Sequence, residues 1–175
     1  KPDLIAFTST SFGFYQINEL AGSIKKVFSA IPIILGGIHS TIKPDDLEDS
    51  NFDAFCIGEG EKPLATLIKK MQRNEDYFNT PSFHFKSNRT IIRNVLEPYE
   101  KNLDNLPPYD WEIFDTHKLL KLREGWVSLS LSRGCPFNCN FCINHKMKEI
   151  QGAKGYVRHK SVGRAISELL YLISR

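Results

Sequence analysis

Apolar residues in the first 72 positions occur in two alternating patterns. Short continuous runs, "LIAF", "IIL" and "AFCI", occupy residues 4–7, 33–35 and 54–57. Between and after them, apolar side chains recur every three or four positions, from Phe14 to Phe28 and from Leu64 to Met71, which predicts amphipathic helices. Short buried strands alternating with such helices are typical of a parallel sheet with helices on its faces. The first part of the chain is therefore expected to be an α/β layer.

The pattern changes after residue 80. "SFHF" and "TIIRN" flank a polar turn and predict a β-hairpin over residues 81–96. Residues 97–117 contain three prolines and little periodicity, which indicates an extended linker. The alternating segment Trp126–Leu131 predicts a strand of a second unit, and a stripe from Val162 to Ile173, with Ser161 as its N-cap, predicts a helix.

Polar or glycine-rich loops follow each of the first three predicted strands. They read "TSTSFG", "GGIHST" and "GEGE". In a parallel sheet the carboxyl ends of the strands lie at one edge, and ligands bind beyond that edge. The three loops are therefore expected to form one binding edge.

Composition excludes several classes of protein. With 41% hydrophobic residues, 25% charged residues and a net charge of +3, the chain has an ordinary globular composition. Its basic residues are scattered, so nothing favours a nucleic-acid partner. No apolar run approaches the ~20 residues that span a bilayer, and no secretion signal opens the chain. We expect no membrane association and a cytoplasmic, reducing compartment, where clustered cysteines bind metals or do chemistry rather than form disulfides.

Three of the four cysteines lie within eight residues, in "SRGCPFNCNFC". Cys135, Cys139 and Cys142 have the spacing C-x3-C-x2-C, and soft thiolates this close suit an iron–sulfur cluster or zinc. A four-iron cluster held by three cysteines leaves one iron open to a small molecule. With His145, the same cysteines could instead form a structural Cys3His zinc site in a non-catalytic, flavodoxin-like binding module. Three unligated thiols are the remaining interpretation.

The cysteine spacing, with Phe141 just before the last cysteine, resembles the signature of radical S-adenosylmethionine enzymes. The flanking "WVSLSLSRGCP" and "YVRHKSVGRAISEL" resemble the first strand and first helix of their TIM-like barrel. The upstream half resembles the cobalamin-binding domain that precedes this barrel in one large subfamily, through "PDLIAFTST", "IPIILGGIHST", "FDAFCIGEGEKPL" and the linker "NLDNLPPYDWEIFD". The resemblance covers nearly the whole chain.

This resemblance implies a fold and a domain organisation. The fold is α/β, with a partial flavodoxin-like, Rossmann-like parallel sheet followed by the start of a radical S-adenosylmethionine barrel. Residues 1–80 would be a partial cobalamin-binding domain, residues 81–122 a hairpin and linker, and residues 123–175 the start of the barrel with the cysteine loop. Further strands of both domains are expected outside this sequence, so the chain is expected to be a fragment that is inactive alone.

The resemblance also implies cofactors and roles. Cys135, Cys139 and Cys142 would ligate a 4Fe–4S cluster that binds and reductively cleaves S-adenosylmethionine, giving a 5′-deoxyadenosyl radical, and Phe141 would pack near the adenine. Cobalamin would be the second cofactor, for methyl transfer or rearrangement, and a flavodoxin or ferredoxin would supply electrons. The residues expected to line the cobalamin nucleotide tail are Thr8, Ser9, Thr10, Gly36, Gly37, Gly58 and Glu59.

Overall fold

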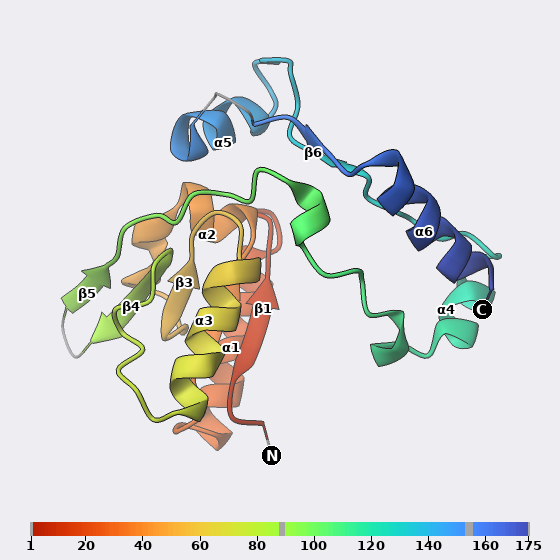
Figure 1. Ribbon diagram of the computed structural model, residues 1–175. Helices are drawn as coiled ribbons and strands as arrows, with labels where there is room; N and C mark the ends of the chain where they lie inside the picture. The colour runs from red at the N-terminus through yellow and green to blue at the C-terminus, as the bar shows by residue number, and fades with distance from the viewer. Residues whose placement is uncertain (1, 88–89, 153–155, 175) are drawn as a thin grey trace. The chain divides into compact units, whose positions relative to one another are not determined.

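The computed structural model describes residues 2–87, 90–152 and 156–174 (Figure 1). Its contacts divide the chain into two compact units, the first made of residues 1–99 and 145–152 and the second of residues 100–144 and 153–175. The elements of the first unit are β1 (Ile5–Thr8), α1 (Phe14–Val27), β2 (Ile33–Gly36), α2 (Ile38–Ile42), η1 (Pro44–Leu47), β3 (Ala54–Cys56), α3 (Glu61–Gln72), β4 (Phe83–Ser87), β5 (Thr90–Arg93) and most of α5 (Asn144–Gln151).

The first unit is built on a five-stranded sheet with the order β1-β2-β3-β4-β5. Strands β1, β2 and β3 run parallel, with Ile5 opposite Ile33 and Ile34 opposite Ala54. This confirms the parallel α/β arrangement predicted from the alternation of apolar runs and helical stripes.

Helices cover both faces of this sheet (Figure 1). On one face, Ala21 of α1 packs in a buried cluster with Ile33, Leu35 and Phe55. On the other face, Leu67 of α3 packs with the intervening residues of the strands, Ile34, Ala54 and Cys56. Because successive side chains of a strand point to opposite faces, one short apolar run serves both clusters. Cys56 is buried in the second cluster, as its place in an apolar strand predicts.

The hairpin predicted at residues 81–96 is present and extends the sheet. Strand β4 pairs antiparallel with β5 and also with β3, where Phe85 lies opposite Ala54. Both Phe83 and Phe85 are fully buried in the cluster under α3. The sheet of the first unit therefore continues beyond residue 80. Its two outer strands are β5 and β1.

The second unit contains shorter elements. They are η2 (Leu103–Asn105), η3 (Trp111–Ile113), α4 (Thr116–Leu122), β6 (Ser132–Arg133), β7 (Arg158–His159) and α6 (Val162–Ile173). Ser161 caps α6 as predicted, because its hydroxyl accepts from the Arg164 N–H over 3.1 Å. The segment expected as a linker is fixed onto this unit: the Arg158 guanidinium donates to the Glu100 carbonyl and that of Arg164 to the Leu106 carbonyl.

The strand expected at Trp126–Leu131 is not formed. Residues 126–131 carry no strand assignment, and the Trp126 side chain is exposed. The only strand nearby is the two-residue β6, which pairs antiparallel with β7. An alternating apolar pattern needs neighbouring strands to pair with, and in the described part of the second unit such pairing reaches this segment only at its end, where the Lys160 N–H donates to the Leu131 carbonyl over 2.9 Å. None of the helices within the described residues combines the length and hydrophobicity needed to cross a bilayer.

Candidate functional site

Seven residues predicted to line a nucleotide tail lie at or just beyond the carboxyl ends of β1, β2 and β3. Thr8 ends β1, Gly36 ends β2 and Gly58 lies two residues beyond β3. The strands are parallel, so the three loops leave the sheet at the same edge. The side chains of Thr8 and Thr10 are exposed, whereas Ser9 is buried.

The first two loops are joined through their backbones. The Ser9 N–H donates to the Gly36 carbonyl over 3.2 Å, and the His39 N–H donates to the Ser9 carbonyl over 3.1 Å. Gly37 lies between these bonds with φ 96° and ψ −162°, a conformation that is essentially restricted to glycine. A Cβ atom at Gly37 would lie 2.6 Å from Thr8 Oγ1 and 3.0 Å from the Ser9 carbonyl oxygen. Glycine is therefore required where the two loops meet.

Helix α2 joins the second loop to the third. The Thr41 hydroxyl donates to the Gly37 carbonyl over 2.8 Å and accepts from the Gly58 N–H over 2.9 Å. The Ser40 hydroxyl donates to the Cys56 carbonyl over 2.7 Å. Both side chains are almost fully buried, so their polar atoms are satisfied inside the protein.

Sequence reasoning missed these contacts, because "GGIHST" was expected to be a loop. The structure begins α2 at Ile38, directly after Gly37. The signal that could have revealed it is the pair of hydroxyl residues three and four positions after Gly37, the spacing of neighbours on one helix face.

The third loop approaches other parts of the first unit closely. Gly58 has φ 80°, and a Cβ atom there would lie 3.0 Å from Gln151 Nε2 and 3.1 Å from Leu96 Cδ1. Glu59 is half-buried and takes part in polar contacts. The edge therefore offers backbone amides, hydroxyl groups and side-chain-free glycine surfaces, which suit a flat, polar ligand that approaches the backbone.

The cysteine loop belongs to the second unit. Cys135, Cys139 and Cys142 carry free thiols, with Cys139 exposed and the other two half-buried. The loop turns where the Cys142 N–H donates to the Cys139 carbonyl over 3.0 Å, and Asn144 Nδ2 donates to the Cys142 sulfur over 3.3 Å. Phe141 is 95% exposed, so its ring packs on nothing in this unit.

The entry to this loop is fixed by Gly134. It has φ 86°, and a Cβ atom there would lie 2.3 Å from the Tyr156 carbonyl oxygen. The Tyr156 hydroxyl in turn donates to Asn144 Oδ1 over 3.2 Å. Glycine before the first cysteine is therefore a steric requirement.

The donor set of this loop fits an iron–sulfur cluster, although its atoms are not gathered around one point. Three reduced thiols on one short loop are the ligands that such clusters use. Within residues 2–87, 90–152 and 156–174, no three His, Cys, Asp or Glu side chains are placed so that they could hold a metal ion. The Cys3His arrangement with His145 is not formed either.

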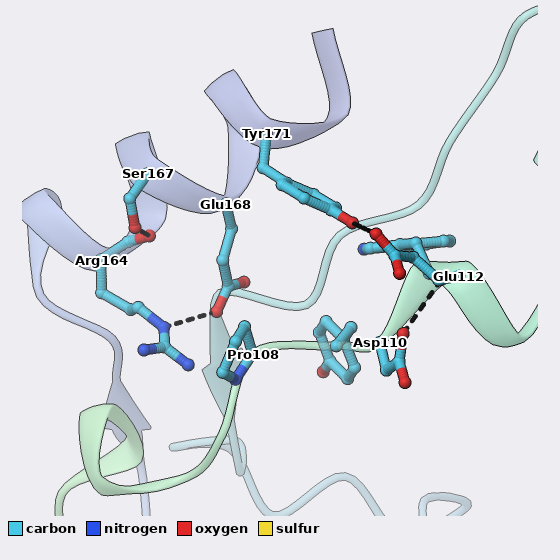
Figure 2. A pocket seen from close by; sticks show the side chains of 9 residues that line it. Pro108, Asp110, Glu112, Arg164, Ser167, Glu168 and Tyr171 are labelled. Atoms are coloured by element: carbon cyan, nitrogen blue, oxygen red, sulfur yellow. Dashed lines mark hydrogen bonds and ion pairs between the residues drawn. The ribbon is translucent and has the colours of Figure 1, made fainter. Parts of the chain in front are cut away.

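A separate cavity of about 450 Å³ lies in the second unit, between residues 108–112 and one face of α6 (Figure 2). At its floor, Glu168 is buried between two cations, with its carboxylate 2.6 Å from Lys160 Nζ and 2.7 Å from Arg164 Nε. Burial tends to raise the pKa of Glu168, but hydrogen bonds from Lys160 and Arg164 outweigh it and hold the pKa below its ordinary value. The carboxylate is therefore an ionised structural anchor.

Comparisons with known proteins agree with the geometry of the sheet edge. Residues 1–68 match the B12 binding domain family. The chain is 30% identical, over 98% of its length, to an uncharacterized methyltransferase of Pyrococcus horikoshii, of which it covers 37%.

Two solved structures share the fold. One is the radical S-adenosylmethionine methyltransferase TsrM from Kitasatospora setae with cobalamin and a [4Fe-4S] cluster bound, with a TM-score of 0.72 and 17% identity over 99% of this chain and 36% of that one. The other is the cobalamin-dependent S-adenosylmethionine radical enzyme OxsB with aqua-cobalamin and S-adenosylmethionine bound, with a TM-score of 0.70 and 21% identity over 98% of this chain and 23% of that one.

These matches cover the chain almost completely, while the chain spans less than two fifths of each of these proteins. They agree with the resemblance seen in the sequence motifs, and they give no support to the zinc-stabilised binding module. Residues 1–68 thus match the B12 binding domain family, and the chain as a whole shares the fold of radical S-adenosylmethionine enzymes that bind cobalamin.

Proposed function

We propose that the first unit binds the nucleotide tail of cobalamin at the edge formed by the three loops. The observation that carries this proposal is the glycine-only conformation of Gly37, which brings the loops after β1 and β2 into contact at one edge of the sheet. Thr8, Thr10 and the backbone of Gly36 would contact the ligand directly. Ser9 is buried, so its contribution would be to hold the first loop in place.

Residues of the cysteine loop in the second unit would serve the other cofactor. Cys135, Cys139 and Cys142 would hold a 4Fe–4S cluster as thiolates, and the exposed Phe141 ring would pack against the adenine of S-adenosylmethionine. The cluster, when bound, supplies the electron that cleaves S-adenosylmethionine reductively and gives a 5′-deoxyadenosyl radical. The role of this chain is to position the three thiolates and the Phe141 ring. Gly134 fixes the entry to the loop, and Asn144 contacts Cys142 at its end.

The reaction proposed for the whole protein is methyl transfer or a rearrangement on a small molecule. Methyl transfer is favoured by the similarity to the Pyrococcus horikoshii relative and to TsrM, both methyltransferases. A flavodoxin or ferredoxin would act as the reductant. The chain contributes the binding domain and the cysteine loop, and the substrate pocket would need the remaining length seen in its relatives.

Titration of the chain with hydroxocobalamin tests the first part of this proposal. We expect saturable binding, seen as a shift of the cobalamin absorption bands, and we expect Gly37→Ala to lose it. Anaerobic reconstitution with iron and sulfide tests the second part, with a brown protein absorbing near ~400 nm expected. Binding of zinc without colour would instead favour the Cys3His alternative.

A further inference from the structure

His39 is a buried, polar residue in the middle of the three-loop edge. It lies on α2, only 4% exposed, and its backbone N–H donates to the Ser9 carbonyl. Its ring stacks on Phe14 of α1, with centroids 3.7 Å apart and planes inclined by 19°. Its Nδ1 lies 3.1 Å from the Ser11 hydroxyl, in the loop after β1. One side chain therefore contacts both α1 and the first loop.

The second ring nitrogen faces a carboxylate. Nε2 lies 3.3 Å from Asp46 Oδ2 of η1. An ionised carboxylate only accepts, so it favours the tautomer of the neutral ring that carries its proton on Nε2. In that tautomer Nδ1 is an acceptor, and the Ser11 hydroxyl donates to it. The ring thereby sets the orientation of the Ser11 side chain.

Packing alone does not account for a histidine here. The pocket between Phe14 and Phe55 is aromatic, and a phenylalanine would fill it without bringing polar atoms into the core. What a histidine adds is two polar contacts, one to Asp46 and one to Ser11. Within the described residues, the contact to Ser11 is the side-chain hydrogen bond that joins α2 to the loop after β1.

We propose that His39 is a positioning residue of the cobalamin edge, which holds the loop of residues 8–13 against α2 through Ser11. The inference rests on the proposed function, because the loop it holds contains Thr8 and Thr10. His39 itself is enclosed by protein, and so it acts through the loop and not on the ligand.

The charges around the ring give this role a pH dependence. Burial is the largest influence and lowers the pKa of His39; nearby Lys43 also lowers it, while Asp46 opposes both. The ring is therefore neutral at neutral pH. A protonated ring would donate from Nδ1 to the Ser11 hydroxyl, so the bond would reverse and the hydroxyl would have to turn from its orientation in the neutral state. Because the pKa of His39 is lowered, we expect cobalamin affinity to fall only where the ring becomes protonated, at a pH below the ordinary histidine value of 6.5.

Three substitutions of His39 separate its contacts. His39→Asn keeps an acceptor near the position of Nδ1, His39→Gln keeps a polar group near Nε2, and His39→Phe keeps only the stacked ring. Hydroxocobalamin is titrated into the full chain and into each variant at pH 7.5 and pH 5.5. We expect His39→Asn to bind within about threefold of the wild type, and the other two to lose about tenfold, the weight of one hydrogen bond. The acid-induced loss should be absent from all three variants.

Amide hydrogen exchange of the same variants without cobalamin gives an independent measure. We expect faster exchange over residues 8–13 in His39→Phe and His39→Gln, and wild-type exchange there in His39→Asn. Equal exchange and equal affinity in His39→Phe and His39→Asn would overturn the inference. Failure of the wild-type chain to bind hydroxocobalamin would overturn the proposed function, while altered exchange in His39→Phe would still support the positioning of the loop.

Discussion

The Thr41 hydroxyl lies 2.9 Å from the backbone nitrogen of Gly58, and through this bond α2 holds the loop after β3. The same hydroxyl donates to the Gly37 carbonyl, in the loop after β2. Thr41 is 2% exposed, so water does not replace either partner. Two of the three loops that form the proposed cobalamin edge are thus fixed by one side chain.

We expect Thr41→Val to lower the free energy of unfolding by about 1–3 kcal/mol, because valine keeps the shape of threonine and leaves the Gly58 N–H without its acceptor. Urea unfolding followed by circular dichroism measures this loss. Thr41→Ser is the matched control, because it keeps the hydroxyl and loses only a methyl group. Equal stability of the valine variant and the wild type would show that the Thr41 hydroxyl does not hold the loop.

Gly37→Ala should be more harmful than Gly36→Ala. A Cβ atom at Gly37 meets Thr8 Oγ1 at 2.6 Å in a backbone conformation that other residues rarely adopt, which should cost on the order of 3 kcal/mol. At Gly36 the nearest atoms lie 3.9 Å from the added Cβ, an ordinary contact. Thermal unfolding of the two variants compares them, and similar melting temperatures would contradict the assigned role of Gly37.

Much of the first unit could be predicted from its sequence, because strand and helix periods are local signals. The strands near Leu4, Ile33 and Ala54 and the helices α1 and α3 lie where the apolar pattern puts them. Helix α2 could not be recognised, because its polar residues His39, Ser40 and Thr41 look solvent-exposed. They are buried because each finds partners in distant loops, which the local pattern does not encode.

Long-range pairing explains the other differences. The hairpin was predicted, but its pairing with β3 depends on contacts such as that between Phe85 and Ala54, far apart in sequence. The alternating segment Trp126–Leu131 has the composition of a strand, yet among the described residues its pairing is limited to the bond from the Lys160 N–H to the Leu131 carbonyl. For the site, the predicted strand order placed the three loops at one edge. The three thiols are not arranged around one point among the described residues, so the cluster site remains a prediction.

The iron content of cysteine variants tests the proposed cluster. We expect Cys135→Ala, Cys139→Ala and Cys142→Ala each to lose most of the iron after anaerobic reconstitution, because a cluster held by two thiolates is poorly retained. Iron quantitation and the absorbance near ~400 nm provide the readout.

Cys56 is the internal control for this series. It is buried under α3, and burial raises the pKa of its thiol to about 12, so it stays a protonated, apolar group at neutral pH. Cys56→Ala should keep its iron, as should His145→Ala, since no fourth protein ligand is expected. Loss of a tightly held zinc from His145→Ala would favour the Cys3His site instead.

Glu168 of α6 should be the most sensitive charged residue of the second unit. Its carboxylate is 6% exposed and contacts both Lys160 and Arg164, so Glu168→Gln leaves two cations without their counter-charge near the buried floor of the cavity (Figure 2). Removing one partner of a buried ion pair typically costs about 3–5 kcal/mol.

The folded-state pKa of Glu168 is lowered, so its contribution is present above the ordinary glutamate value of 4.5 and is lost as the pH falls below it. Unfolding is measured at pH 7 and pH 3.5. One pH unit below 4.5 changes the contribution of a single group by at most about 1.4 kcal/mol, so the difference between wild type and variant should be smaller at pH 3.5 by up to that amount. Glu149→Gln, at an exposed ion pair with Lys146, is the control and should change nothing measurable. A difference between wild type and Glu168→Gln that is the same at both pH values would mean that the ionised carboxylate is not what stabilises this unit.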